Sequence, residues 1–139
     1  MPRLLSIDYG KKRTGIAVSD PLQIIANGLT TVETSNLFEF LKDYLQKEHV
    51  VTIVVGLPKQ MNGEMSENMR RIEPFVNRLR KLYPQIAVEY FDERFSSKMA
   101  QKAMIEGGVK KKERQNKALV DEISATIILQ GYMESKRGF

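Results

Sequence analysis

The chain has no cysteine and a single histidine, His49. Without cysteine it can form no disulfide bond, no thiolate metal site and no cysteine nucleophile. One histidine argues against a zinc site and against Ser-His-Asp catalysis. A metal ion bound by this protein would therefore need oxygen ligands, which favours Mg²⁺ or Mn²⁺.

Long hydrophobic runs are also missing. No stretch approaches the ~20 apolar residues that a membrane helix needs, and Asp8 interrupts the N-terminal segment before a signal-peptide core could form. We therefore expect a cytoplasmic protein with no membrane contact. The 139 residues, of which 42% are hydrophobic and 28% charged, suit one core, and no repeat or linker divides them. A single domain over residues 1–139 is expected.

The net charge of +5 is concentrated in two short segments. Residues 110–117 (KKKERQNK) hold five bases and one acid, and a second basic triplet, KKR, occupies residues 11–13. Such clustering favours contacts with phosphates, although solvated loops are the alternative. The predicted nucleic-acid contacts are Lys11, Lys12, Arg13, Arg94, Lys110, Lys111, Lys112, Arg114 and Lys117.

Apolar and alternating patterns predict five strands, over Arg3–Asp8, Thr14–Ser19, Ile24–Val32, Val50–Val55 and Ile86–Phe91. Helical spacing predicts helices over Leu37–Glu48, Ser66–Tyr83, 96–107 and Ala118–Ser135. Short connections make the first three strands an antiparallel meander, and crossovers add the other two. The predicted fold is α/β, a mixed five-stranded sheet with three antiparallel and two parallel strands, flanked by helices.

Single residues predict further details of these helices, strands and turns. Asn36 can cap the first helix, with Glu39 three residues on. Gly10 and Gly15 are expected to adopt turn conformations that other residues avoid, and Gly28 marks a bulge in the third strand. Pro74 lies inside the second helix, where it costs a hydrogen bond.

Three acidic positions fall where a ligand site would form. Asp8 closes the first strand, Asp92 and Glu93 end the fifth, and ligand sites in mixed sheets form beyond strand ends. Asp121 lies in the first turn of the last helix, which carries small residues that would let it approach the sheet. Taken singly, these acids could be a turn cap, an ion-pair partner and a helix-dipole acid.

Taken together, the acids suit a two-metal site. Carboxylates gathered in one place repel each other unless cations are bound. Two divalent ions about 4 Å apart would hold the attacking water and the leaving oxygen during phosphodiester cleavage. We therefore predict Asp8, Glu93 and Asp121 as catalytic residues and metal ligands, with Asp92 as the alternative to Glu93.

Four segments of the sequence resemble the YqgF or RuvX family, whose members are named as Holliday junction resolvases or pre-16S rRNA nucleases. They are IDYGKKRTGIAVSD (Ile7–Asp20), GLPKQMNG (Gly56–Gly63), DERFSS (Asp92–Ser97) and DEISATIILQGY (Asp121–Tyr132). The resemblance implies a ribonuclease H-like fold, related to the RuvC resolvase. It equates the family's acids with Asp8, Asp92 or Glu93, and Asp121. Ser97 stands where the family often has threonine.

The resemblance implies a bacterial nuclease that matures the 5′ end of 16S ribosomal RNA, with pre-16S rRNA and ribosomal precursor particles as partners. Two alternatives stay open. A resolvase of four-way DNA junctions normally requires a symmetric dimer, whereas we expect a monomer, or at most a weak dimer. A non-catalytic RNA-binding assembly factor would gain nothing from acids that repel phosphates.

Overall fold

The computed structural model describes residues 2–57, 69–92 and 117–136. The strands are β1 (Arg3–Asp8), β2 (Arg13–Ser19), β3 (Ala26–Glu33), β4 (Val50–Leu57) and β5 (Ala87–Asp92). The helices are α1 (Leu37–Lys47), α2 (Met69–Leu82) and α5 (Lys117–Lys136), with a 3₁₀ turn, η1 (Thr34–Asn36), before α1. The expected helix over 96–107 lies outside the described residues. In the described part, no helix has the length and apolar character that crossing a bilayer requires.

The five strands form one sheet in the order β3-β2-β1-β4-β5. Strand β2 is antiparallel to β1 and β3, whereas β4 is parallel to β1 and β5. The predicted mixed sheet is confirmed. Because β1 is the central strand and is parallel to β4 and β5, the carboxyl ends of these three strands share one edge of the sheet.

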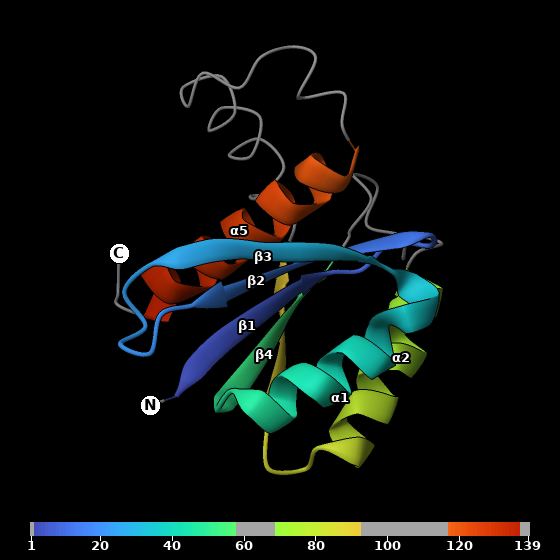
Figure 1. The fold of residues 1–139 in the computed structure, drawn as a ribbon, viewed down its shortest axis with the longest axis horizontal. Helices are drawn as coiled ribbons and strands as arrows, with labels where there is room; N and C mark the ends of the chain where they lie inside the picture. The colour runs from blue at the N-terminus through green and yellow to red at the C-terminus, as the bar shows by residue number, and fades with distance from the viewer. Residues whose placement is uncertain (1, 58–68, 93–116, 137–139) are drawn as a thin grey trace.

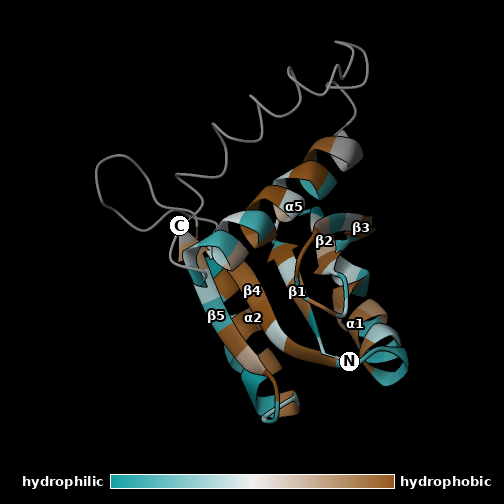
Figure 2. Cartoon of the chain, turned by 90° about the vertical axis from the view of Figure 1, so that its left-hand side faces the viewer, coloured by the Kyte–Doolittle hydropathy of each residue, from teal (hydrophilic) through white to brown (hydrophobic). Residues whose placement is uncertain are grey.

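Helix α5 covers one face of the sheet, and α1 and α2 cover the other (Figure 1). Successive side chains of β1 point to opposite faces of the sheet. Leu5 and Ile7 belong to the core under α1 and α2, and Leu4 belongs to the core under α5. The middle strands are accordingly hydrophobic along much of their length (Figure 2), as strands covered on both faces should be.

Two glycines have a different role from the one the sequence predicts. A Cβ on Gly15 would overlap the backbone carbonyl of Asp121 in α5, and a Cβ on Gly10 would overlap the carbonyl of Arg13. Neither glycine has a positive φ. The expectation of unusual backbone angles is therefore wrong, since the requirement at both positions is close approach. The bulge prediction is confirmed, because the β2–β3 register shifts between Ala17↔Gly28 and Ile16↔Thr30.

Strand β3 begins two residues later than expected. The carboxylate of Asp20 accepts the N–H groups of Ile24 and Ile25 at 2.7 and 2.8 Å, and that of Leu22 at 3.2 Å. These bonds hold the β2–β3 connection as a loop, with Gln23 at a φ of 58°. The loop leaves Ile24 and Ile25 exposed, outside the strand.

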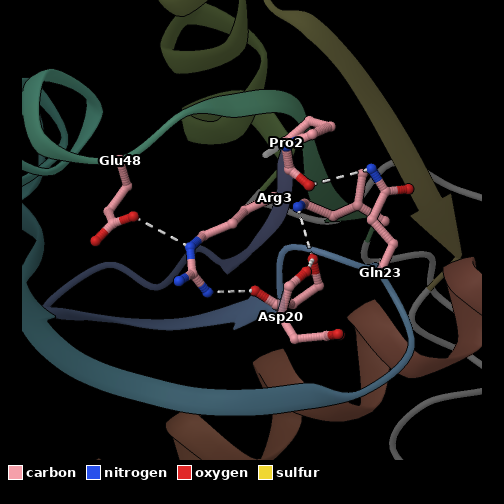
Figure 3. Close-up of polar contacts among 7 residues, drawn as sticks. Pro2, Arg3, Asp20, Gln23 and Glu48 are labelled. Carbon is pink, nitrogen blue, oxygen red and sulfur yellow. Dashed lines mark hydrogen bonds and ion pairs between the residues drawn. The ribbon is translucent and has the colours of Figure 1, made fainter.

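Residues at the amino end of β1 form hydrogen bonds with the end of β2, with the β2–β3 connection and with the α1–β4 connection (Figure 3). Arg3 donates from Nε to Glu48 Oε2 at 3.2 Å and from Nη1 to the carbonyl of Ser19 at 3.0 Å. Gln23 donates to the carbonyl of Pro2 at 3.3 Å. The first strand is thus held at the end opposite to Asp8.

Asn36 precedes α1 as predicted, but its side chain makes no capping hydrogen bond. A capping side chain usually requires an extended backbone at its own residue. Asn36 ends the 3₁₀ turn instead, at φ −103° and ψ 5°. The predicted capping interaction is therefore wrong, although the helix boundary is right.

The Gly15 contact predicts that Gly15→Ala destabilises the protein by about 1–3 kcal/mol, the usual cost of overpacking. Urea unfolding would measure this change. Gly131→Ala is the matched control, because a Cβ there would meet the far end of the partly exposed Phe91 side chain, at 2.9 Å, and not a backbone atom, and alanine favours a helix. Equal destabilisation by the two variants would contradict the backbone-contact explanation.

The hydrogen bonds that the Asp20 carboxylate accepts in the β2–β3 loop predict that the stability of the protein depends on the protonation of Asp20. The N–H of Ile25 has the largest effect and lowers the pKa of this carboxyl below its usual 3.8; desolvation, the second effect in size, raises the pKa, and the N–H groups of Ile24 and Leu22 lower it further. A lowered folded-state pKa means that the contribution to stability is present above pH 3.8 and is lost as the pH falls through the folded pKa. An NMR titration of the Asp20 carboxyl carbon should show this, and a pKa of 3.8 or above would contradict it.

Candidate active site

Asp8 is the last residue of β1, at the carboxyl end of the central strand. It has the same parity along β1 as Leu4, which packs under α5, and Ser6, whose Oγ donates to the carbonyl of Ala125 in α5 at 2.6 Å. Strand alternation therefore places Asp8 on the α5 face. Its backbone partner on β2 is Gly15.

Asp121 reaches the same corner from the other end of the sequence. Its backbone lies directly against Gly15, which is paired with Asp8. Ala125 and Ile128, the small and apolar residues expected to face the sheet, are fully buried. The prediction that α5 lies close to the sheet is confirmed, and it brings the backbone of Asp121 beside the end of β1.

Arg13 forms an ion pair with Asp121. Its Nε donates to Oδ2 at 3.1 Å, with 39% of the arginine side chain and 27% of the aspartate side chain exposed. The pair occupies Oδ2, and the carboxylate has a second oxygen to offer a ligand. A partly exposed pair of this kind contributes about 0–1 kcal/mol to stability. Its main effect is to place a positive charge beside Asp121.

Glu122, the neighbour of Asp121, points elsewhere. Its carboxylate lies over Gly28 of β3, where a Cβ would be 2.6 Å from Oε1. The helix therefore presents Asp121, and not Glu122, to the position next to Gly15. Glu122 offers a carboxylate of similar exposure class that lies away from Asp8.

The turn after β1 is anchored by Thr34, a residue that the sequence analysis missed. Thr34 donates from Oγ1 to the carbonyl of Gly10 at 2.6 Å and from its N–H to the carbonyl of Lys12 at 3.0 Å. Lys11 and Lys12 are exposed on this turn. Two predicted phosphate contacts thus follow Asp8 on a turn with a defined position. No sequence signal marks Thr34, because its partners lie more than twenty residues away.

Of the two candidates for the third acid, the structure describes Asp92 but not Glu93. Asp92 ends β5 with its backbone paired to Leu57 of β4. Glu93 lies outside the described residues, as do Arg94, Lys110, Lys111, Lys112 and Arg114, and Lys117 is described only as the first residue of α5. Within 2–57, 69–92 and 117–136, no three acidic or histidine side chains form a group that could hold a metal ion.

The sheet order, the acid at the end of the central strand and the acid on the helix that crosses it define a ribonuclease H-like protein. The chain belongs to the RuvX family, whose model carries the description "Holliday junction resolvase" and matches residues 2–135. The family resemblance seen in the sequence is thereby confirmed over nearly the whole chain.

Curated bacterial relatives align along their full length. A protein of Phocaeicola vulgatus is 67% identical over 137 residues, which cover 99% of this chain and 99% of that protein. A protein of Flavobacterium johnsoniae is 58% identical with the same coverage. Both carry the name "Putative pre-16S rRNA nuclease".

Solved structures show the same fold at low identity. The crystal structure of the fowlpox virus Holliday junction resolvase has a TM-score of 0.58 at 16% identity, covering 96% of this chain and 99% of that one. The complex of fowlpox virus resolvase with Holliday junction DNA has a TM-score of 0.55 at 15% identity, covering 96% and 98%. At this level of identity the likeness concerns the fold alone.

The ion pair predicts that Arg13→Gln changes the free energy of unfolding by no more than about 1 kcal/mol, because both side chains are partly exposed. Lys12→Gln on the same turn is the matched control. Chemical denaturation of the two variants tests this, and a loss of several kcal/mol in Arg13→Gln alone would show that the pair is structural.

Proposed function

We propose that this protein is a divalent-metal-dependent nuclease that hydrolyses phosphodiester bonds, with Asp8 and Asp121 as metal ligands. The observation that carries the proposal is the meeting of these two residues at the carboxyl end of the central strand. Asp8 ends β1, and the backbone of Asp121 lies on its paired residue, Gly15. A protein that only binds nucleic acid would not benefit from carboxylates at this place.

Glu93 is the third ligand in this proposal. Along β5, Glu89 and Phe91 contact α5, through Tyr132 and Gly131 respectively. Glu93 has the same parity in the sequence, and Asp92 has the opposite parity. This alternation supports Glu93 over Asp92 for a site on the α5 face.

The donor set fits a hard cation. Asp8 and Asp121 offer carboxylate oxygens, the ligands that Mg²⁺ and Mn²⁺ prefer. When bound, such ions supply charge stabilisation and an activated water. Asp8 and Asp121 would hold them, Arg13 would keep the Asp121 carboxylate in place, and Lys11 and Lys12 would contact the substrate backbone next to the scissile bond.

We propose the precursor of 16S ribosomal RNA as the substrate, cut during maturation of its 5′ end in cytoplasmic ribosomal precursor particles by a monomeric, single-domain enzyme. Support comes from relatives that are 67% and 58% identical over 99% of the chain and are named for this RNA. Four-way DNA junctions are the second candidate, supported by the description of the family model.

The test is cleavage of a labelled 5′ precursor 16S RNA and of a labelled four-way DNA junction, each in Mg²⁺, Mn²⁺ or EDTA. Metal ligation contributes several kcal/mol of charge stabilisation, so Asp8→Asn and Asp121→Asn should lower the rate by roughly 10³-fold or more. Glu93→Gln should do the same. The matched controls are Glu122→Gln and Asp92→Asn, which should cleave like the unchanged protein.

The outcomes separate the candidates. Metal-dependent cutting of RNA alone supports the ribosomal role, and cutting of the junction by a dimer supports the resolvase. Binding without cutting under every metal would overturn the nuclease proposal in favour of an assembly factor. Without metal, the Asp8→Asn protein should have an equal or higher melting temperature, because the change removes one of the like charges gathered in the proposed site.

A further inference from the structure

A small pocket opens beside the proposed active site, on the face of the sheet covered by α1 and α2. Its volume is about 230 Å³, below the ~300–1,000 Å³ typical of sites for drug-sized ligands. The lining residues come from the end of β1, from the start of α1 and from α2: Tyr9, Thr34, Leu37, Phe38, Arg71, Pro74, Phe75 and Arg78. A group the size of one base or one phosphate suits this space.

Three aromatic rings form its wall. The rings of Tyr9 and Phe75 are 4.9 Å apart between centroids, and those of Phe38 and Phe75 are 5.2 Å apart. Phe75 is buried, whereas Tyr9 and Phe38 are only half-buried. Partly exposed rings fixed by a buried neighbour are suited to stacking on a planar group such as a base.

The charged residues that line the pocket are both arginines. Arg71 and Arg78 lie seven residues apart, two turns along one side of α2, and Pro74 lies between them on the pocket wall. The guanidinium of Arg78 sits 4.4 Å above the Phe38 ring. The wall therefore combines stacking surfaces with two cations, which is the combination used to bind single-stranded nucleic acid.

A larger pocket shares Phe38 and Arg78 with this one, but its charged residues are of both signs. It has a volume of about 820 Å³ and lies at the amino ends of β4 and β5, away from Asp8. Its wall mixes acids such as Glu39 and Glu48 with bases such as Lys42. Its charges give no preference for an anion.

The small pocket has a defined position relative to Asp8. Tyr9 follows Asp8 in the chain, and the alternation of β1 places the two side chains on opposite faces. Thr34 lines the pocket and also holds the turn through Gly10 and Lys12. The pocket therefore opens beside the turn that follows Asp8.

We propose that this pocket binds one unstacked nucleotide of the substrate strand, next to the scissile phosphate. The base stacks on Tyr9, and Arg71 and Arg78, the latter held over the Phe38 ring, contact the adjoining phosphate. This inference rests on the proposed nuclease function, since it assigns a subsite to that site. It implies that the protein prefers an unpaired strand to a continuous duplex at this position.

The test measures binding without cleavage. A short single-stranded RNA carrying a fluorescent label and one 2-aminopurine is titrated against Asp8→Asn protein in EDTA, and the duplex of the same RNA is the comparison. The double variant Arg71→Gln/Arg78→Gln should weaken single-strand binding about tenfold, and its salt dependence should fall by ~0.7 in slope for each lost phosphate contact. The matched control, Arg70→Gln, alters an exposed arginine on the same helix that does not line the pocket.

Stacking of the base on Tyr9 is measured separately, by the fluorescence of the 2-aminopurine. The 2-aminopurine should be quenched on binding, Tyr9→Leu should relieve the quenching, and Tyr9→Phe should restore it. Unchanged affinity in the double arginine variant, or equal loss in Arg70→Gln, would overturn the pocket while leaving the nuclease proposal to the cleavage assay. Preferred binding of the duplex would also overturn it. Absence of any RNA binding would count against both proposals.

Discussion

The position of α5 depends on one place where helix backbone touches strand backbone. Gly15 has no side chain, so the carbonyl of Asp121 can lie against β2 at the residue paired with Asp8. Any larger residue would lift the amino-terminal part of the helix from the sheet. The hydrogen bond from buried Ser6 to Ala125 fixes the next turn. Packing between backbones therefore sets how close the backbones of Asp8 and Asp121 lie to each other.

The strands, the mixed sheet and the close approach of α5 to the sheet could be predicted from the sequence because each has a local signal. The apolar run that ends in Asp8 and the small residues after Asp121 are examples. The role of Gly15 could not, because a close approach depends on a segment more than one hundred residues away. For the same reason Thr34 and the arginines of α2 were missed. Asn36 failed as a cap because the 3₁₀ turn before it changes its backbone.

The two faces of the sheet at the end of β1 carry different parts of the proposed function. Asp8 belongs to the face under α5, together with Gly15 and the ion pair of Arg13 with Asp121. The next residue, Tyr9, belongs to the face under α1 and α2. In the proposed nuclease, bond cleavage and strand recognition would thus depend on residues that are adjacent in sequence but point to opposite sides of the end of β1, so that either could change by substitution without loss of the other.

The hydrogen bond between Ser6 and Ala125 joins residues 119 positions apart. During synthesis, a ribosome that has made the sheet and α1 has produced Asp8 but not the helix that carries Asp121. A partly made chain therefore holds only one half of the acid pair. In the proposed nuclease, metal binding by this pair would therefore have to wait until the last helix has been made and has packed on the sheet.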